Sequence, residues 1–339
     1  MKKRSSQLDA LRAVAILLVF GSHVTGPPIW SRVGWTGVDL FFVLSGFLIA
    51  GLLFREYKSR LRLDLWRFIS RRAMKIYPAY YVLLIGTLAF DLLRQGTFSW
   101  SRVWPDLIFV QNYRIGLWDH LWSIATEEQF YILLPLTLAL LIFRRHSAPF
   151  DRIPVICIFV MCFCLLGRVA SVVWQTNALW FPGCIRGFDG LALGVMMAYL
   201  TEFRPACLNA VCKQRTLLLT VSLSCLLPAI IYPITHPVMW TVGLTLVYFG
   251  YAGVLIYFLR FVDGENRVIR ALAYVGSYSY TIYLFHMPVA RYLVPTLRID
   301  RHVALAAYLA ASIGLGALLS TLIERPALRA RERFFPSRA

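Results

Sequence analysis

The chain has 339 residues, of which 59% are hydrophobic and only 15% are charged. Soluble globular proteins carry fewer apolar and more charged residues, so this composition excludes an ordinary soluble protein. The net charge of +18 would suit a nucleic-acid-binding protein, but no segment between the apolar runs is long enough to form a soluble basic surface. We therefore expect a single all-α membrane domain over residues 1–339, with no nucleic-acid partner.

A membrane-spanning helix needs about 20 mostly apolar residues. Runs of this kind predict a bundle of about ten transmembrane helices, at residues 8–25, 34–54, 77–95, 121–143, 152–174, 184–202, 216–232, 238–260, 270–293 and 302–323. The first run is not followed by a small-residue cleavage motif, which indicates a retained helix rather than a signal peptide. The seventh and eighth runs are joined by the short segment 232–238, so we expect them to form a helical hairpin.

The Lys and Arg residues are distributed unevenly between the two sides of these helices. With a cytoplasmic N-terminus, 25 of the 35 basic residues fall in cytoplasmic segments and eight on the opposite side. Because cytoplasmic loops of membrane proteins are enriched in Lys and Arg, this excess predicts that both termini are cytoplasmic. We expect the last helix to end at Glu324-Arg325-Pro326, with a basic tail over about residues 325–339, of which the stretch from Arg329 to Arg338 is expected to be disordered.

The seven cysteines do not have the pattern of a disulfide framework or a metal site. Five lie in apolar runs and two in a predicted cytoplasmic loop, and no Cys and His residues have the spacing of metal ligands. We therefore expect reduced, packed thiols and no bound metal.

The first two apolar runs carry ionisable residues, with Arg12 and His23 in the first and Asp39 in the second. An ionisable group inside a membrane span is costly and is a candidate functional residue. Arg12 and His23 are about three helical turns apart, so a continuous helix would place both on one face. The alternative is that both are buried structural groups of a transporter or lipid-handling bundle. Secondary transporters usually show repeats with interrupted helices, and this sequence shows none.

A dense cationic segment precedes the third apolar run. Arg71, Arg72 and Lys75 lie at its end, where we expect the helix to enter the membrane. Arg72 and Lys75 are three residues apart and would share a helix face. These cations suit a phosphate-rich ligand at the cytoplasmic mouth of the bundle. The alternative is that the run reflects topology and contact with anionic lipid headgroups.

Further charged residues stand within or beside later apolar runs. Glu127 and Glu128 are at the head of the fourth run. They either cap the positive end of that helix or lie deeper and need a polar partner. Arg168 in the fifth run is expected to pair with an embedded carboxylate, and Arg186 and Asp189 at the start of the sixth run are expected to pair with each other.

Five stretches, each weak alone, occur together and in order from one end of the chain to the other. They are Leu8-Asp9-Ala10-Leu11-Arg12 with His23; Gly37-Val38-Asp39-Leu40-Phe41-Phe42-Val43-Leu44-Ser45-Gly46-Phe47; Arg71-Arg72-Ala73-Met74-Lys75-Ile76-Tyr77-Pro78; Leu121-Trp122-Ser123 with Glu127 and Phe130-Tyr131; and Ser279-Tyr280 through His286. In combination they resemble the acyltransferase-three family of bacterial integral-membrane O-acyltransferases.

The resemblance implies a multi-pass enzyme of the bacterial cytoplasmic (inner) membrane. It implies transfer of an acyl group, commonly acetyl from acetyl-coenzyme A, to a hydroxyl of an extracytoplasmic glycan or glycolipid, with no permanently bound cofactor. Arg12 and His23 match the functional pair of the family's first helix. The family's basic R-x-x-R pattern reads Arg72-Ala73-Met74-Lys75 here, and the second position therefore keeps its charge but loses the bidentate guanidinium fork. Some members carry an appended periplasmic hydrolase-like domain, which we expect this chain to lack because it ends at Ala339.

These residues give a mechanistic hypothesis for acyl transfer. His23 is the candidate base, because histidine titrates near neutral pH. Asp39 or Glu127 would orient the His23 imidazole, in the manner of a base and its orienting carboxylate. The cations Arg12, Arg71, Arg72 and Lys75 would hold the coenzyme A phosphates.

Two further readings remain open for the activity. The chain has no Gly-x-Ser-x-Gly motif, which favours direct transfer over a serine acyl-enzyme. The acceptor is alternatively a small lipophilic molecule such as a macrolide. The alternative that involves no acyl transfer is that the protein is a non-enzymatic transporter of glycan or lipid.

Overall fold

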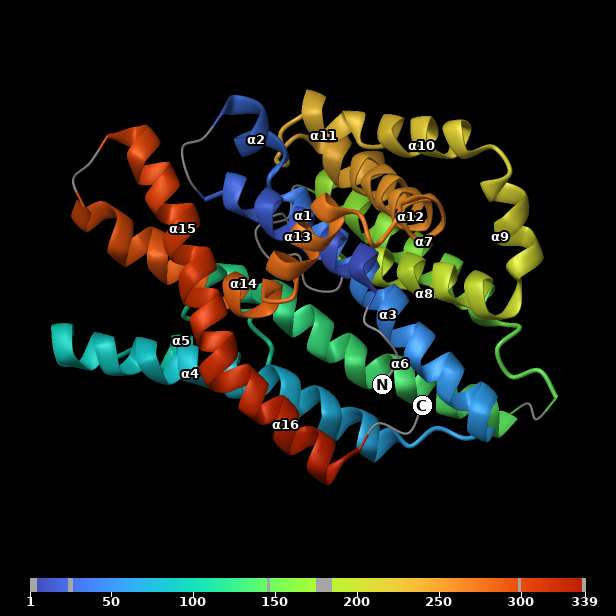
Figure 1. Ribbon diagram of the computed structural model, residues 1–339, viewed down its shortest axis with the longest axis horizontal. Coiled ribbons are helices and arrows are strands. Elements are labelled where there is room, and N and C mark those ends of the chain that lie inside the picture. Colours follow the sequence, from blue (N-terminus) through green and yellow to red (C-terminus); the bar gives the residue numbers. More distant parts are fainter. Residues whose placement is uncertain (1–4, 24–26, 145–146, 175–184, 298–299, 337–339) are drawn as a thin grey trace.

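The computed structural model describes residues 5–23, 27–144, 147–174, 185–297 and 300–336. Within these ranges the secondary structure is helical and contains no strand, which confirms the all-α prediction (Figure 1). In chain order the elements are α1 Ser6–Gly21, α2 Pro28–Val33, α3 Thr36–Arg60, α4 Leu65–Gln95, α5 Trp100–Leu107, η1 Asp119–Leu121, α6 Trp122–Arg144, α7 Ile153–Val173, α8 Phe188–Phe203, α9 Pro205–Cys212, α10 Arg215–Ser224, α11 Leu227–Ile231, η3 Met239–Gly243, α12 Leu244–Phe261, α13 Arg267–Gly276, α14 Ser279–Pro288, η4 Val289–Leu293, η5 Val294–Leu297, α15 Arg301–Leu319, η6 Ser320–Glu324 and α16 Arg325–Phe334.

Six helices in the described part of the chain are long and apolar enough to cross a membrane. They are Thr36–Arg60, Leu65–Gln95, Asp119–Arg144, Ile153–Val173, Met239–Phe261 and Arg301–Phe334. A seventh span results if α8 and α9, which meet at a bend of 106°, are counted as one. The predicted number of ten is therefore not confirmed, because the remaining apolar runs form shorter or broken helices. The expected hairpin of the seventh and eighth runs does form, since α10 packs along α12.

Helix α1 ends earlier than the apolar run predicted. Its last residue is Gly21, and the backbone N–H of His23 donates to the carbonyl of Phe20 in a tighter turn (3.2 Å). The indole of Trp30 in α2 donates to the carbonyl of Leu17 (2.8 Å), so α2 packs against the last turns of α1. His23 therefore lies beyond the helix, and its position relative to Arg12 is set by this turn rather than by helical periodicity.

Helices α3 and α8 approach each other closely at two glycines. A Cβ atom on Gly46 would lie 2.1 Å from the backbone oxygen of Leu191, and one on Gly194 would lie 2.3 Å from the backbone oxygen of Val43. Small residues at a helix contact allow backbones to approach, which is a common way of packing helices in membranes. This approach brings charged residues of α3 and α8 into the interior of the bundle.

The C-terminal segment corrects two expectations. The last helix does not end at Glu324-Arg325-Pro326 but continues from α15 through the π-helical turn η6 into α16 as far as Phe334 (Figure 1). Pro326, which has no N–H for a backbone hydrogen bond, directly follows the π-helical turn η6 and Arg325, where the helical hydrogen-bond pattern changes. The expected disorder of the tail is wrong up to Phe334, because α16 packs along α4 and Glu332 forms an ion pair with Arg71 (2.7 Å).

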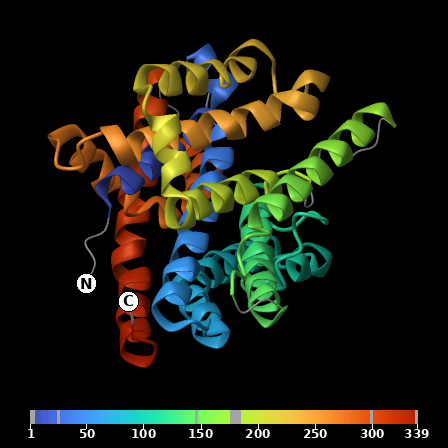
Figure 2. The ribbon, with the colours of Figure 1, turned by 90° about the vertical axis from the view of Figure 1, so that its right-hand side faces the viewer.

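Several cationic segments expected to be cytoplasmic are joined by ion pairs. Arg55 and Lys58 near the end of α3 both contact Glu202 near the end of α8 (2.9 and 3.2 Å). Arg204 in turn contacts Asp151, which precedes α7 (3.4 Å). Figure 2 shows the end of α3 and the C-terminal helix reaching the same end of the molecule. This grouping agrees with the positive-inside prediction, while the side on which the termini lie stays a prediction.

The segment between α4 and α6 is held by a buried carboxylate outside the spanning helices. Asp106 in α5 is fully buried and accepts from the backbone N–H of Leu117 (2.6 Å). Burial raises the pKa of the Asp106 carboxyl to about 7. The folded protein therefore binds this proton more tightly than the unfolded chain does. The stability of the folded protein should fall as pH rises from about 4, near the ordinary Asp pKa, to about 7.

This expectation is tested by thermal unfolding in detergent at pH 4.5 to 8 for the native protein and for Asp106→Asn. The amide keeps an oxygen for the Leu117 bond but does not ionise. As pH rises through this window, the free energy of unfolding of the native protein should fall faster than that of the variant, by at most about 1.4 kcal/mol per pH unit. Parallel pH curves for the two proteins would contradict the assignment.

Candidate active site

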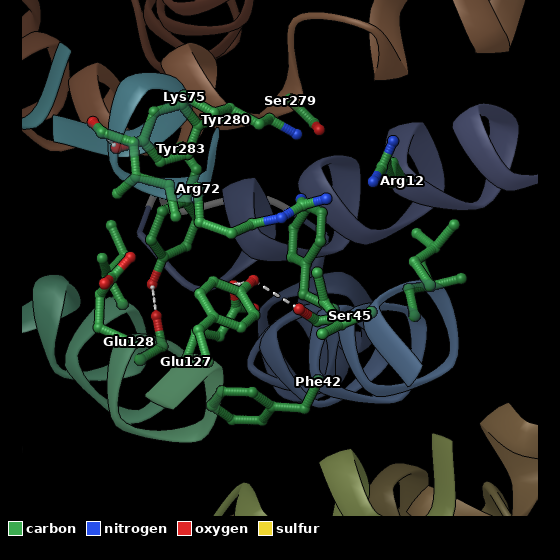
Figure 3. A pocket seen from close by; sticks show the side chains of 18 of the residues that line it. Arg12, Phe42, Ser45, Arg72, Lys75, Glu127, Glu128, Ser279, Tyr280 and Tyr283 are labelled. Atoms are coloured by element: carbon green, nitrogen blue, oxygen red, sulfur yellow. Dashed lines mark hydrogen bonds between the residues drawn. The ribbon is translucent and has the colours of Figure 1, made fainter. Parts of the chain in front are cut away.

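A pocket opens between α1, α3, α4, α6 and α14, with about 990 Å³ of empty space when its open part is included (Figure 3). Four of the seven residues that the sequence predicted for the site line it, and they come from three helices: Arg12, Arg72, Lys75 and Glu127. Among the described residues, the pocket wall includes neither His23, Asp39 nor Arg71.

One side of the pocket is cationic. Arg12 comes from α1 and is paired with Asp9 (2.8 Å). Arg72 and Lys75 come from α4 and share its pocket face, as their spacing predicted (Figure 3). The Arg72 guanidinium lies over the ring of Phe68 (5.6 Å to the centroid), and no described residue forms an ion pair with it. Arg72 is thus placed to bind an anionic group that enters the pocket.

Helix α4 begins twelve residues before the predicted start of the third span, and this extension carries the cations. Asp64 caps it by accepting from the backbone N–H of Arg67 (3.1 Å). Arg71 points away from the pocket to Glu332 of α16 and also donates to the carbonyl of Phe335. The structure therefore separates Arg71 from the two other cations of its motif.

Three acidic residues also line the pocket: Glu127, Glu128 and Glu324. Glu127 accepts from the hydroxyl of Tyr131 (2.6 Å), and that hydroxyl also bonds Ser45 of α3 (2.7 Å). Glu128 accepts from Tyr77 (3.3 Å), and its second oxygen is buried with no hydrogen-bond partner among the described residues. These two glutamates line the pocket and contact tyrosine hydroxyls, so a role limited to capping the helix does not account for their contacts.

The third acidic residue, Glu324, was not singled out from the sequence. It is buried in the wall of the pocket and accepts from Ser320 one turn earlier (2.9 Å). Sequence reasoning placed Glu324 at the end of the last helix, where a charged residue needs no further explanation. Helical periodicity that continues beyond Pro326 is the sequence feature that could have shown Glu324 to lie inside a helix rather than at its end.

Tyr283 forms the wall between the pocket and a cluster of histidines. Its hydroxyl bonds the side chain of Ser123 (2.7 Å) and donates to the backbone carbonyl of His120 (2.7 Å). Its ring lies 5.5 Å from the rings of both His120 and His286. The ring of His23 lies 5.0 Å from that of His286. His23, which is exposed, therefore stands on the far side of Tyr283 from the cations.

Two buried ion pairs lie beside the site, and one is not the pair that we predicted. Arg186 pairs with Asp39 (3.2 Å) rather than with Asp189, and Asp39 also accepts from Tyr248 (2.9 Å). Asp189 pairs instead with Arg168, which confirms that Arg168 has an embedded carboxylate as its partner. Because the Asp39 carboxylate is held by Arg186 and Tyr248, the structure does not bring it to His23 as an orienting group.

The fold and this pocket define a multi-pass membrane protein with a charged cavity inside its helical bundle. A sequence profile described as an acyltransferase domain matches residues 5–322, and the chain belongs to this family. It is 25% identical over 313 residues to the O-acetyltransferase OatA of Staphylococcus aureus, covering 83% of this chain and 50% of that protein.

A second relative is the peptidoglycan O-acetyltransferase OatA of Listeria monocytogenes, 26% identical over 337 residues, with 88% of this chain and 51% of that protein covered. The chain thus spans about half the length of these curated relatives. No solved structure matches it.

Proposed function

We propose that the protein is a membrane O-acetyltransferase that moves an acetyl group from acetyl-coenzyme A to a hydroxyl of an extracytoplasmic glycan or glycolipid. The observation that carries the proposal is the pocket in which Arg12, Arg72 and Lys75 line one side of a cavity inside an apolar bundle. Arg72 forms no ion pair with any described residue, and such a buried cation is costly unless a ligand supplies negative charge. The names of the two relatives support acetyl as the group transferred and peptidoglycan as one acceptor to test.

The donor would bind with its phosphates against the cations and its thioester directed toward Tyr283. Arginine and lysine are suited to phosphate groups, Arg72 through its planar fork and Lys75 as a point charge. In the cytoplasmic membrane, acetyl-coenzyme A would enter this pocket from the cell interior. The acceptor would bind on the other side of Tyr283, next to His23. The thioester and His23 meet only if the Tyr283 side chain moves from its bond to Ser123.

The reaction needs no co-reactant beyond donor and acceptor. The His23 imidazole takes the proton of the acceptor hydroxyl as its oxygen attacks the thioester carbonyl. A C–O bond forms, the C–S bond breaks, and the proton passes from His23 to the departing coenzyme A thiolate. The products are the acetyl ester and free coenzyme A, with the histidine returned to its neutral form.

Replacing His23 with alanine should abolish this reaction. General base catalysis contributes about 10²- to 10⁴-fold to a rate, so we expect at least a 100-fold loss of acetyl transfer. Membranes that contain the protein are incubated with radiolabelled acetyl-coenzyme A, and base-labile acetate on envelope glycan is measured. The loss should occur with normal amounts of inserted protein.

His236 provides the matched control. It stacks on Tyr232 in the connection between α11 and η3 and is not among the described residues of the pocket wall. His236→Ala should keep activity within about twofold of the native protein. Full activity of His23→Ala would remove His23 from the mechanism. A failure of the native protein to consume acetyl-coenzyme A would favour a transporter.

A further inference from the structure

Two ring nitrogens beside His23 are buried and have no hydrogen-bond partner in the described part of the chain: Nε2 of His286 and Nδ1 of His120. His286 is fully buried and His120 is 5% exposed. An unpaired buried polar atom costs free energy, so its presence beside a functional residue needs an explanation.

The backbone fixes which nitrogen of each ring carries its proton. His286 Nδ1 lies 2.6 Å from the carbonyl of Tyr283, and His120 Nε2 lies 3.2 Å from the carbonyl of Leu284. A carbonyl oxygen only accepts, so each of these nitrogens is a donor. In a neutral ring the other nitrogen then carries a lone pair. His286 Nε2 and His120 Nδ1 are therefore both hydrogen-bond acceptors held in fixed orientation.

His286 is the histidine that contacts His23. The two ring centroids are 5.0 Å apart with planes inclined at 57°, whereas His120 makes its ring contact with a histidine of this cluster to His286. An N–H···N bond of about 3 Å between two imidazoles places their centroids roughly 5 Å apart. The carboxylates named as orienting groups are engaged elsewhere, Asp39 with Arg186 and Glu127 with Tyr131.

We propose that His286 is the positioning residue for His23. Its Nε2 accepts the N–H of one His23 nitrogen during the reaction, and this leaves the other nitrogen free to take the proton of the acceptor hydroxyl. When His23 becomes an imidazolium, the same bond is charge-assisted and strengthens. Packing against Phe20 and the bond to Tyr283 keep the His286 ring from turning away. This inference rests on the proposed role of His23 as base.

Two substitutions at position 286 separate the two nitrogens. Asparagine places an amide near Nδ1 and keeps a donor for the Tyr283 carbonyl, but it has no acceptor at the position of Nε2. Glutamine reaches the position of Nε2 with an oxygen. We expect His286→Asn to lower kcat by about 10- to 100-fold with an unchanged KM for acetyl-coenzyme A, and His286→Gln to stay within about threefold of the native kcat.

His120→Gln is the control in the same cluster. Its amide nitrogen keeps a donor for the Leu284 carbonyl while the unpaired acceptor is removed, and kcat should stay within about threefold. The unfolding temperature of each variant in detergent is measured alongside, together with the rate at which diethyl pyrocarbonate modifies His23. That rate should fall in His286→Asn and not in His286→Gln, whatever the acceptor used.

The outcomes separate this inference from the proposed function. Loss of activity in His23→Ala with equal kcat values for His286→Asn and His286→Gln, high or low, would overturn the role of His286 alone. Unchanged modification of His23 in His286→Asn would also overturn it. Full activity of His23→Ala would overturn the proposed function.

Discussion

Replacing Arg168 with methionine is expected to destabilise the protein by about 3–5 kcal/mol, because it leaves the Asp189 carboxylate buried and unpaired. Both side chains are inaccessible to solvent, at 0% and 1% exposed. Arg168 also donates to the carbonyl of Ile185 (2.9 Å) and to the hydroxyl of Thr245 (2.7 Å), so the substitution removes three partners at once. These contacts join α7, α8 and α12 around the charge pair.

The free energy of unfolding in detergent micelles measures this loss, and two further variants separate charge from packing. The double variant Arg168→Met with Asp189→Leu removes both charges and should recover a large part of the stability. Arg204→Met breaks a similar Arg–Asp pair, but its side chains are 55% and 49% exposed. Arg204→Met should lower the free energy of unfolding by less than about 1 kcal/mol. Equal stability losses in Arg168→Met and Arg204→Met would contradict the argument.

The helical bundle and part of the site were predictable from the sequence, because both depend on local pattern. Apolar runs of about 20 residues gave α3, α4, α6, α7, α12 and α15. Arg72 and Lys75 share a pocket face because they lie three residues apart within one continuous helix. Glu127 joins them because it lies in the first turns of a long helix that faces the same cavity.

The parts that could not be predicted depend on where helices end and on which charges meet across the bundle. The shared face of Arg12 and His23 assumed a helix that continues to His23, but the contact of Trp30 with the end of α1 intervenes. Asp39 pairs with Arg186, which is 147 positions away in the chain. Helical periodicity carries no information about such contacts.

The C-terminal helix is another part of the fold that local sequence pattern did not predict, here because a segment expected to be disordered is ordered. Its composition is basic and polar, which reads as a disordered tail. Its contacts with α4, and above all the pair of Glu332 with Arg71, order it as α16. The ion pair, between residues 261 positions apart, occupies Arg71 and leaves Arg72 as the arginine of α4 that is available to a ligand.

Replacing Arg72 with methionine should raise the KM for acetyl-coenzyme A by about 10- to 100-fold, the loss expected for hydrogen bonds to a charged group. Arg72 lines the pocket, and no described residue forms an ion pair with it, so in the proposed mechanism its guanidinium binds a donor phosphate. Arg72→Lys keeps the charge and loses the fork, and its KM should fall between those of the native protein and Arg72→Met. Initial rates at varied donor concentration measure the effect.

The neighbouring Arg71 is a matched control because it lies on the same helix turn and carries the same side chain. Its guanidinium already donates to Glu332 and to the carbonyl of Phe335, so little of its donor capacity is left for a phosphate. Arg71→Met should change the donor KM by less than about threefold, although it loosens the contact of α16 with α4. If Arg71→Met raised the KM as much as Arg72→Met, both arginines would have to face the donor. The ion pair with Glu332 would then have to open when the donor binds.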